Sequence, residues 1–229
     1  MKNFVNDIVN LFYPQSCAAC NEMLVQGEKT LCMKCRNDLP QTHFHSEKEN
    51  LLEQRFWGRV KLEIVVARYF FRKGSRVQSL LHNIKYHAHK ESAVQIAREY
   101  GSELHDAKIF DEIDFLIPIP MHHRKKLMRG FNQSEEIAKG LSETLHVPVE
   151  EKMLKKIIQT KTQTRKHRYE RWENVNESFI VTDKEKTSGK NILLVDDVIT
   201  TGATIEAAAE KLIEANAKVY VAALACSMQ

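Results

Sequence analysis

A single thirteen-residue run, Ile192 to Thr204, constrains the fold of this 229-residue chain more than any other feature. It begins with four apolar residues, continues with Asp196 and Asp197, and passes through a Thr- and Gly-containing loop into a helical apolar pattern. A short apolar run bounded in this way is typical of a buried strand. The run therefore predicts strand, acidic turn, loop and helix, a unit from which open α/β sheets are built.

The same run predicts a ligand. Ligands of open α/β sheets bind beyond the carboxyl ends of the strands, where the two carboxylates would accept hydrogen bonds from vicinal ribose hydroxyls. The helix N-terminus that follows attracts a phosphate, and Gly202 permits close backbone approach. An ordinary strand-turn-helix with an Asp cap would explain one Asp and one Thr, but not two acids followed by TTGAT. The threonine hydroxyls of the loop add further donors.

Strand and helix patterns alternate along most of the chain. Period-two or continuous apolar runs predict strands, and apolar residues three and four apart predict helices. Strands are expected within 60–71, 115–119, 154–158, 179–181, 191–195 and 218–226, and helices at 77–86, 93–104, 133–145 and 204–215. The predicted class is α/β, with a mainly parallel sheet flanked by helices.

Four cysteines are concentrated near the N-terminus in two C-x2-C pairs separated by eleven residues. Each pair aims two thiolates at one point, so the two pairs together complete a tetrahedral zinc site without a position for water. The alternative is a pair of disulfides, but a reducing cytoplasm disfavours disulfide bonds. We predict a structural zinc ion bound by Cys17, Cys20, Cys32 and Cys35.

The domain organisation follows from these patterns. An amphipathic helix is expected at the N-terminus and forms, with the four-cysteine module, a unit over 1–42. A linker is expected over 43–58 and the α/β domain over 59–229. The chain shows neither a secretion signal nor an apolar run long enough to cross a membrane, so we expect a cytoplasmic protein without a membrane span.

Positive charge is concentrated in two places, although the net charge is only +4. Residues 152–171 contain eight Lys or Arg and one acid, and a second cluster contains Arg124, Lys125, Lys126 and Arg129. These clusters are either solvated faces or surfaces that bind polyanions such as pyrophosphate, nucleotides or nucleic acid.

The motifs resemble those of a known family. VDDVITTGAT resembles the phosphoribosyl pyrophosphate fingerprint of type I phosphoribosyltransferases, and the whole chain resembles the ComF branch, competence-type proteins with a double zinc ribbon. The resemblance also rests on the four-cysteine knuckle, on Ile84-Lys85-Tyr86, on Ile117 to His122, on Arg129-Gly130-Phe131-Asn132-Gln133 and on Gln163-Thr164 followed by Arg171.

The resemblance implies a role for each motif. Asp196 and Asp197 would bind the ribose hydroxyls of phosphoribosyl pyrophosphate. The 5′-phosphate would be bound by the loop behind them, Thr200, Thr201, Gly202, Ala203 and Thr204. Arg124 and Arg129 would face the pyrophosphate, where cations stabilise charge on the leaving group. Mg²⁺ would be held mostly by the ligand's own oxygens and by water. Residues 163–175 would close over the site and bring Arg168 or Arg171 to it.

Two functions remain open at this stage. One is an enzyme that transfers ribose 5-phosphate to an unknown acceptor with loss of pyrophosphate. The other is an accessory of natural transformation that handles single-stranded DNA after uptake beside a helicase-like partner, as the family's link to transformation implies. A basic groove with the aromatic residues Tyr169 and Trp172 suits single strands. Fold and motif do not choose between them.

Overall fold

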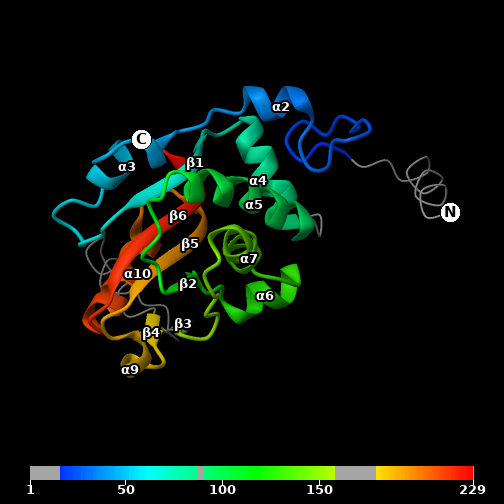
Figure 1. The fold of residues 1–229 in the computed structure, drawn as a ribbon. Coiled ribbons are helices and arrows are strands. Elements are labelled where there is room, and N and C mark those ends of the chain that lie inside the picture. The colour runs from blue at the N-terminus through cyan, green and yellow to red at the C-terminus, as the bar shows by residue number, and fades with distance from the viewer. Residues whose placement is uncertain (1–15, 87–89, 158–178, 229) are drawn as a thin grey trace, which may run out of the picture.

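The structure is a computed structural model, and it describes residues 16–86, 90–157 and 179–228. Its centre is a four-stranded sheet in the order β1-β6-β5-β2 (Figure 1). The strands are β1 (Val65–Phe71), β2 (Phe115–Pro118), β5 (Asn191–Ile199) and β6 (Lys218–Ser227), and every neighbouring pair is parallel. The predicted α/β class is confirmed.

Helices cover both faces of this sheet (Figure 1). Helices α5 (Lys90–Asp106) and α7 (Gln133–Leu145) pack together on one face, and α10 (Ala203–Glu214) covers the other. The chain leaving β2 therefore turns to one face, while the chain leaving β5 turns to the opposite face. Such a change of direction marks the carboxyl ends of β2 and β5, the place where ligands of such sheets generally bind.

The apolar runs that predicted strands are buried because both sheet faces are covered. Ile192, Leu193 and Leu194 of β5 are fully inaccessible to solvent, as are Val221 and Ala222 of β6. Cys226, the fifth cysteine, is also buried and belongs to this core. A strand with both faces covered has no need for alternating polar residues, which is why these two runs are continuously apolar.

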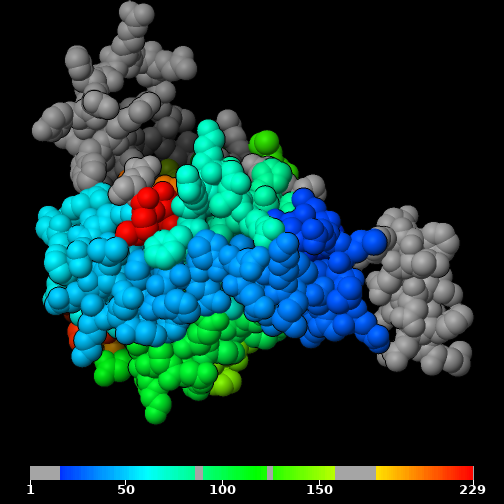
Figure 2. All heavy atoms as spheres, turned by 90° about the horizontal axis from the view of Figure 1, so that it is seen from above, coloured from blue at the N-terminus to red at the C-terminus, as the bar shows by residue number. Residues whose placement is uncertain are grey.

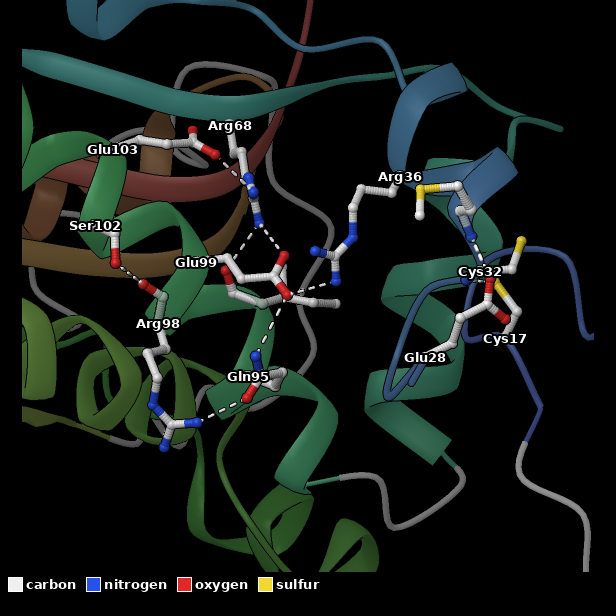
Figure 3. A network of polar contacts seen from close by, with 12 residues as sticks. Cys17, Glu28, Cys32, Arg36, Arg68, Gln95, Arg98, Glu99, Ser102 and Glu103 are labelled. Carbon is white, nitrogen blue, oxygen red and sulfur yellow. Dashed lines mark hydrogen bonds and ion pairs between the residues drawn. The ribbon is translucent and has the colours of Figure 1, made fainter. Parts of the chain in front are cut away.

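The four-cysteine segment packs directly against the α/β domain. It leads into α2 (Met33–Asp38), whose Arg36 forms an ion pair with Glu99 of α5 at 2.9 Å (Figure 3). Helix α4 (Arg76–Tyr86) supplies Asn83, which donates hydrogen bonds to the Ala18 carbonyl and to Asn21 Oδ1, each at 2.9 Å. Seen from above, the residues from this segment through α3 form one continuous band across the domain (Figure 2).

A buried arginine network connects β1 to α5 (Figure 3). The Arg68 side chain donates to the Ile96 carbonyl at 3.0 Å and to Glu103 at 2.7 Å, and it lies 3.6 Å from Glu99. Glu99 thus lies between Arg68 of the sheet and Arg36 of α2. These carboxylates and the carbonyl offset the cost of burying the guanidinium, while Arg68 Nε has no hydrogen-bond partner among the described residues.

The segment expected to be a linker, 43–58, is folded and packed. It contains the 3₁₀ turn η1 (Phe44–Ser46) and the short helix α3 (Leu51–Gln54). Asn50 caps α3 and Glu53 completes a capping box, while Phe44, Leu52 and Phe56 are buried. The apolar residues of this segment are too few and irregular to show a helical or strand period in the sequence. The domain boundaries drawn from the sequence remain a prediction.

The remaining elements are short. Strands β3 (Leu154–Lys156) and β4 (Phe179–Val181) form a separate antiparallel pair, and α9 (Lys184–Thr187) follows β4. Helix α6 (His123–Arg129), which the sequence did not predict, precedes α7. The expected N-terminal helix lies outside the described residues. Among the helices of the described ranges, none has the length and apolar character to span a bilayer.

Candidate functional site

The acidic pair stands toward the carboxyl end of β5, directly after Val195, which pairs with the last residue of β2. Asp196 Oδ1 accepts hydrogen bonds from the Ser134 hydroxyl at 3.0 Å and from the backbone N–H of Asp197 at 2.8 Å. Burial and the neighbouring Asp197 carboxylate raise the pKa of Asp196 to about 7, although these two hydrogen bonds oppose the rise. Near neutral pH this carboxyl is therefore able both to accept and to release a proton.

Lys85, at the end of α4, forms an ion pair with Asp197. Both side chains are partly buried, with 22% of Lys85 and 14% of Asp197 exposed. Two adjacent carboxylates would repel a phosphate dianion. Because the ammonium of Lys85 offsets one of them, the negative potential at the site is reduced.

The loop after β5 is accessible. Thr200, Thr201 and Thr204 are exposed, and Gly202 is the N-cap of α10 in a left-handed conformation with φ of 85°. A Cβ at Gly202 would lie 2.8 Å from the Phe56 ring, so packing under the loop also requires glycine here. The predicted phosphate-binding residues thus form one turn at the start of a twelve-residue helix, with the three threonines exposed, Ala203 half-buried and Gly202 buried.

Two arginines of the segment 51–59, which is named here the α3 segment, donate hydrogen bonds to backbone carbonyls of this loop. Arg55 donates to the Thr200 carbonyl at 2.6 Å and to the Ser227 carbonyl at 2.5 Å. Arg59 donates to the Thr201 carbonyl at 3.4 Å and forms an ion pair with Glu206, which is 2% exposed. The α3 segment therefore holds the backbone of residues 200–204, the predicted phosphate loop, through its carbonyls.

The start of α7 borders the acidic pair. Asn132 caps α7 by accepting from the Ser134 N–H at 3.2 Å, and its amide donates to the carbonyl of Ile119 just beyond β2. Arg129, predicted to face pyrophosphate, donates to Gln133 Oε1 at 3.1 Å. Arg129 is thus placed at the helix start that carries Ser134.

Two predicted site residues are not placed. Arg171 lies outside the described residues, as do Arg168 and the whole of the expected closing segment 163–175. The backbone of Arg124 lies in α6, but its side chain is not described. The roles assigned to all the predicted ligand-binding residues remain predictions.

The four cysteines of the predicted metal site come together. Their Sγ atoms all lie within 4.8 Å of one another, and Cys20 Sγ lies 3.8 Å from Cys32 Sγ. Sulfurs about 2.3 Å from a tetrahedral zinc ion are about 3.8 Å apart. None of the five cysteines, all of which are described, forms a disulfide.

The electrostatics of this cluster also fit a cation. Backbone hydrogen bonds, led by that from Cys32, lower the pKa of Cys17 to about 7 despite the opposing effect of burial. Burial and the adjacent thiols raise the pKa values of Cys20 and Cys35. Four close thiolates repel one another unless a cation neutralises them, so the cluster is consistent with a structural zinc ion.

Sequence reasoning missed three residues of the site. Ser134 contacts Asp196, and Arg55 and Arg59 contact the phosphate loop. Ser134 directly follows the Asn132-Gln133 pair that carried the family resemblance, and this position was the available signal. Nothing in the local pattern marked the two arginines, because their partners are backbone carbonyls about 140 residues away.

A parallel sheet with an acidic pair and an exposed phosphate-type loop at one strand end defines a phosphoribosyltransferase-type domain. Residues 85–229 match the phosphoribosyl transferase domain family, and residues 8–45 match the double zinc ribbon domain. The chain therefore belongs to the phosphoribosyltransferase-domain family. More narrowly it is a member of the ComF/YhgH family, in which both domains occur together.

The curated relatives agree with this assignment. The DNA utilization protein YhgH of Shigella flexneri is 28% identical over 86% of this chain and 83% of its own length. Competence protein F of Haemophilus influenzae is 25% identical over 85% of this chain and 89% of its own. Competence protein ComFC of Bacillus subtilis is 33% identical over a shorter region, 47% of this chain and 42% of its own.

Proposed function

We propose that this protein binds phosphoribosyl pyrophosphate with Mg²⁺ at the carboxyl ends of β5 and β2. The observation that carries the proposal is the continuity of the acidic pair with an exposed loop that enters α10. A ligand with vicinal hydroxyls and a 5′-phosphate matches this order of acceptors and donors. The carboxylates accept hydrogen bonds from the hydroxyls. The loop N–H groups and the helix N-terminus donate hydrogen bonds to the phosphate.

The surroundings of the acidic pair support a sugar phosphate over a simple cation site. Lys85 offsets the charge of Asp197, and the raised pKa of Asp196 reduces the average charge further. Such a pair has too little free negative charge for a dedicated metal cage. Mg²⁺ would instead arrive with the pyrophosphate and be held mainly by the ligand's oxygens and by water.

Transfer chemistry at this site would depend on positioning and electrostatics. Departure of pyrophosphate from the sugar develops negative charge on the leaving group. Arg129, Arg124 and Arg171 are the side chains we propose to stabilise that charge. The acceptor that would attack the sugar is not defined by the site.

Calorimetric titration of phosphoribosyl pyrophosphate, with and without Mg²⁺, tests the binding proposal. We expect saturable, Mg²⁺-dependent binding that Asp197→Asn weakens at least about tenfold. Lys139→Gln, which alters an exposed lysine on α7, is the matched control and should bind like the wild type. Absence of binding by a folded, zinc-loaded wild-type protein would refute the proposal.

A role in DNA use is the second candidate, and the relatives support it. YhgH is named as a DNA utilization protein and competence protein F as a competence protein, and both align over 85% or more of this chain. In this alternative the basic stretch 152–171 binds single-stranded DNA, and the site at the strand ends serves a regulatory ligand or a DNA phosphate.

Two assays distinguish the candidates. Pyrophosphate release measured across pooled bases and amines reports transfer, and oligonucleotide binding measured over a salt series reports electrostatic DNA binding. Charge reversal at Lys166, Arg168 and Arg171 should abolish DNA binding, whereas Lys61→Glu, at an 86% exposed side chain, should not. Release without salt-sensitive DNA binding favours transfer, and the opposite result favours DNA handling.

A further inference from the structure

The α3 segment, on the side of the phosphate loop that faces the core, holds two consecutive carbonyls of that loop. Arg55 binds the Thr200 carbonyl at 2.6 Å, and Arg59 binds the Thr201 carbonyl at 3.4 Å. Each guanidinium is itself fixed by a second acceptor, the Ser227 carbonyl for Arg55 and Glu206 for Arg59. The two carbonyls are therefore held from one side by anchored groups.

This arrangement determines where the loop's N–H groups point. In a trans peptide the C=O and N–H bonds point in opposite directions, and no cis peptide occurs in the described chain. Holding the carbonyls of Thr200 and Thr201 on the α3 side therefore directs the N–H groups of Thr201 and Gly202 to the other side. Neither N–H donates a hydrogen bond to another described residue.

Phe56 completes the support. Its ring lies directly against Gly202, at 2.8 Å from where a Cβ would stand. Phe56 is buried, as is Glu206, so the ring contact beneath Gly202 is shielded from water, while the hydrogen bonds of Arg55 to Thr200 and of Arg59 to Thr201 are exposed. A loop supported in this way keeps one conformation before a ligand arrives, and preorganised donors bind an anion without a reorganisation cost.

We propose that Arg55 and Arg59 are positioning residues that orient the Thr201 and Gly202 N–H groups toward the 5′-phosphate of the ligand. The inference rests on the proposed function for the identity of the ligand. Both arginines precede β1 and lie outside the two regions, 8–45 and 85–229, that match the domain families. The inference therefore gives the segment before β1 a part in the site. The two arginines act through the loop backbone and do not contact the phosphate.

The test compares the backbone order of the loop, measured as ¹⁵N order parameters, and the hydrogen exchange of core amides with phosphate binding in the full-length, zinc-loaded protein. The variants are Arg55→Gln, the conservative Arg55→Lys, and Arg59→Gln combined with Glu206→Gln so that no buried charge is left unpaired. Arg98→Gln, which removes an exposed ion pair with Glu143 away from the loop, is the control. The probes are inorganic phosphate and phosphoribosyl pyrophosphate with Mg²⁺.

In ligand-free Arg55→Gln we expect lower backbone order parameters at Thr201 and Gly202 than in the wild type, with the hydrogen exchange of core amides unchanged. We expect both probes to bind this variant about tenfold more weakly, with partial recovery in Arg55→Lys and none of these effects in Arg98→Gln. The Arg59→Gln/Glu206→Gln variant should resemble Arg55→Gln.

Unchanged order parameters at Thr201 and Gly202, or unchanged affinity for both probes, would overturn the inference. A uniform rise in hydrogen exchange across the core would also overturn it, because the arginines would then only stabilise the fold. If the wild type binds neither probe, the proposed function fails on its own, and the order-parameter comparison still decides whether the arginines hold the loop in one conformation.

Discussion

Lys85 and Asp197 form an ion pair that joins the end of α4 to the end of β5. Two residues earlier on the same helix, Asn83 holds the Ala18 carbonyl of the zinc module. Residues two apart on a helix point to nearly opposite sides. Helix α4 therefore lies between the metal module and the acidic pair and contacts both.

Loss of the Lys85 charge should weaken ligand binding. In Lys85→Gln the carboxylates of Asp196 and Asp197 lose their compensating cation, so they repel the phosphate and each other more strongly. We expect about tenfold weaker binding of phosphoribosyl pyrophosphate, measured by calorimetry. Lys85→Arg keeps the charge and should retain most of the affinity, and equal binding by the Gln variant would contradict this role.

Ligand affinity should depend on the ionisation of Asp196. Its pKa is raised to about 7, and its ionised form is the better acceptor for a ribose hydroxyl, so binding should strengthen between about pH 6 and pH 8. Phosphates of the ligand also titrate near pH 6. Asp196→Asn keeps the ligand's own pH dependence and removes that of the protein, so the difference between the two titrations isolates Asp196.

The same pKa shift has the opposite effect on stability. The folded state holds the Asp196 proton more tightly than the unfolded chain, whose carboxyl titrates near pH 4. The contribution of this group to stability is therefore fully present below about pH 4 and is lost as the pH rises through about 7. Denaturant titrations from pH 5 to pH 8 should show a shallower decline in Asp196→Asn than in the wild type.

Removal of zinc should destabilise more than the N-terminal module. Cys17→Ser with Cys32→Ser should lose the metal and lower the melting temperature by about 10 °C or more, since structural zinc contributes directly to folding. Metal analysis and calorimetry give the two measurements. Cys226→Ala removes a core thiol outside the cluster and should keep full zinc content; retained zinc in the double variant would refute the site.

Asn83 should stabilise the contact between the two domains. Asn83→Ala leaves the Ala18 carbonyl without its donor, which should cost about 2 kcal/mol and lower the melting temperature by about 4 to 8 °C. Arg76→Gln removes an exposed ion pair with Asp38 between the same two parts of the chain. That control should cost under about 1 kcal/mol, and equal effects of the two substitutions would argue against a specific role for Asn83.

Substitution of Gly202 by alanine should lower the melting temperature for two separable reasons. Gly202→Ala introduces both a left-handed alanine and a contact with the Phe56 ring, whereas Gly189→Ala, with φ of 75° and open space, introduces only the first. The melting temperature should fall further for Gly202→Ala than for Gly189→Ala. Phe56→Leu combined with Gly202→Ala should recover part of that excess; no recovery would show that the ring is not the obstacle.

Much of the fold was predictable because its signals are local. The apolar runs of β5 and β6, the helical stripes of α5, α7 and α10, and the spacing of the four cysteines each reflect neighbouring residues. The acidic pair and the Thr-Gly loop are likewise contiguous, so the sequence alone identified the candidate ligand site and its place at a strand end.

The supports of the site belong to the tertiary structure alone. Ser134 donates a hydrogen bond to Asp196, 62 residues away, and Arg55 donates one to Thr200, 145 residues away. Lys85 of α4 forms an ion pair with Asp197 of β5. The partners of Arg55 and Arg59 include backbone carbonyls, which carry no mark in a sequence. Local patterning therefore determined the elements and motifs of this protein, whereas only three-dimensional packing decided which side chains support the loop, because hydrogen bonds of this kind depend on distances between elements.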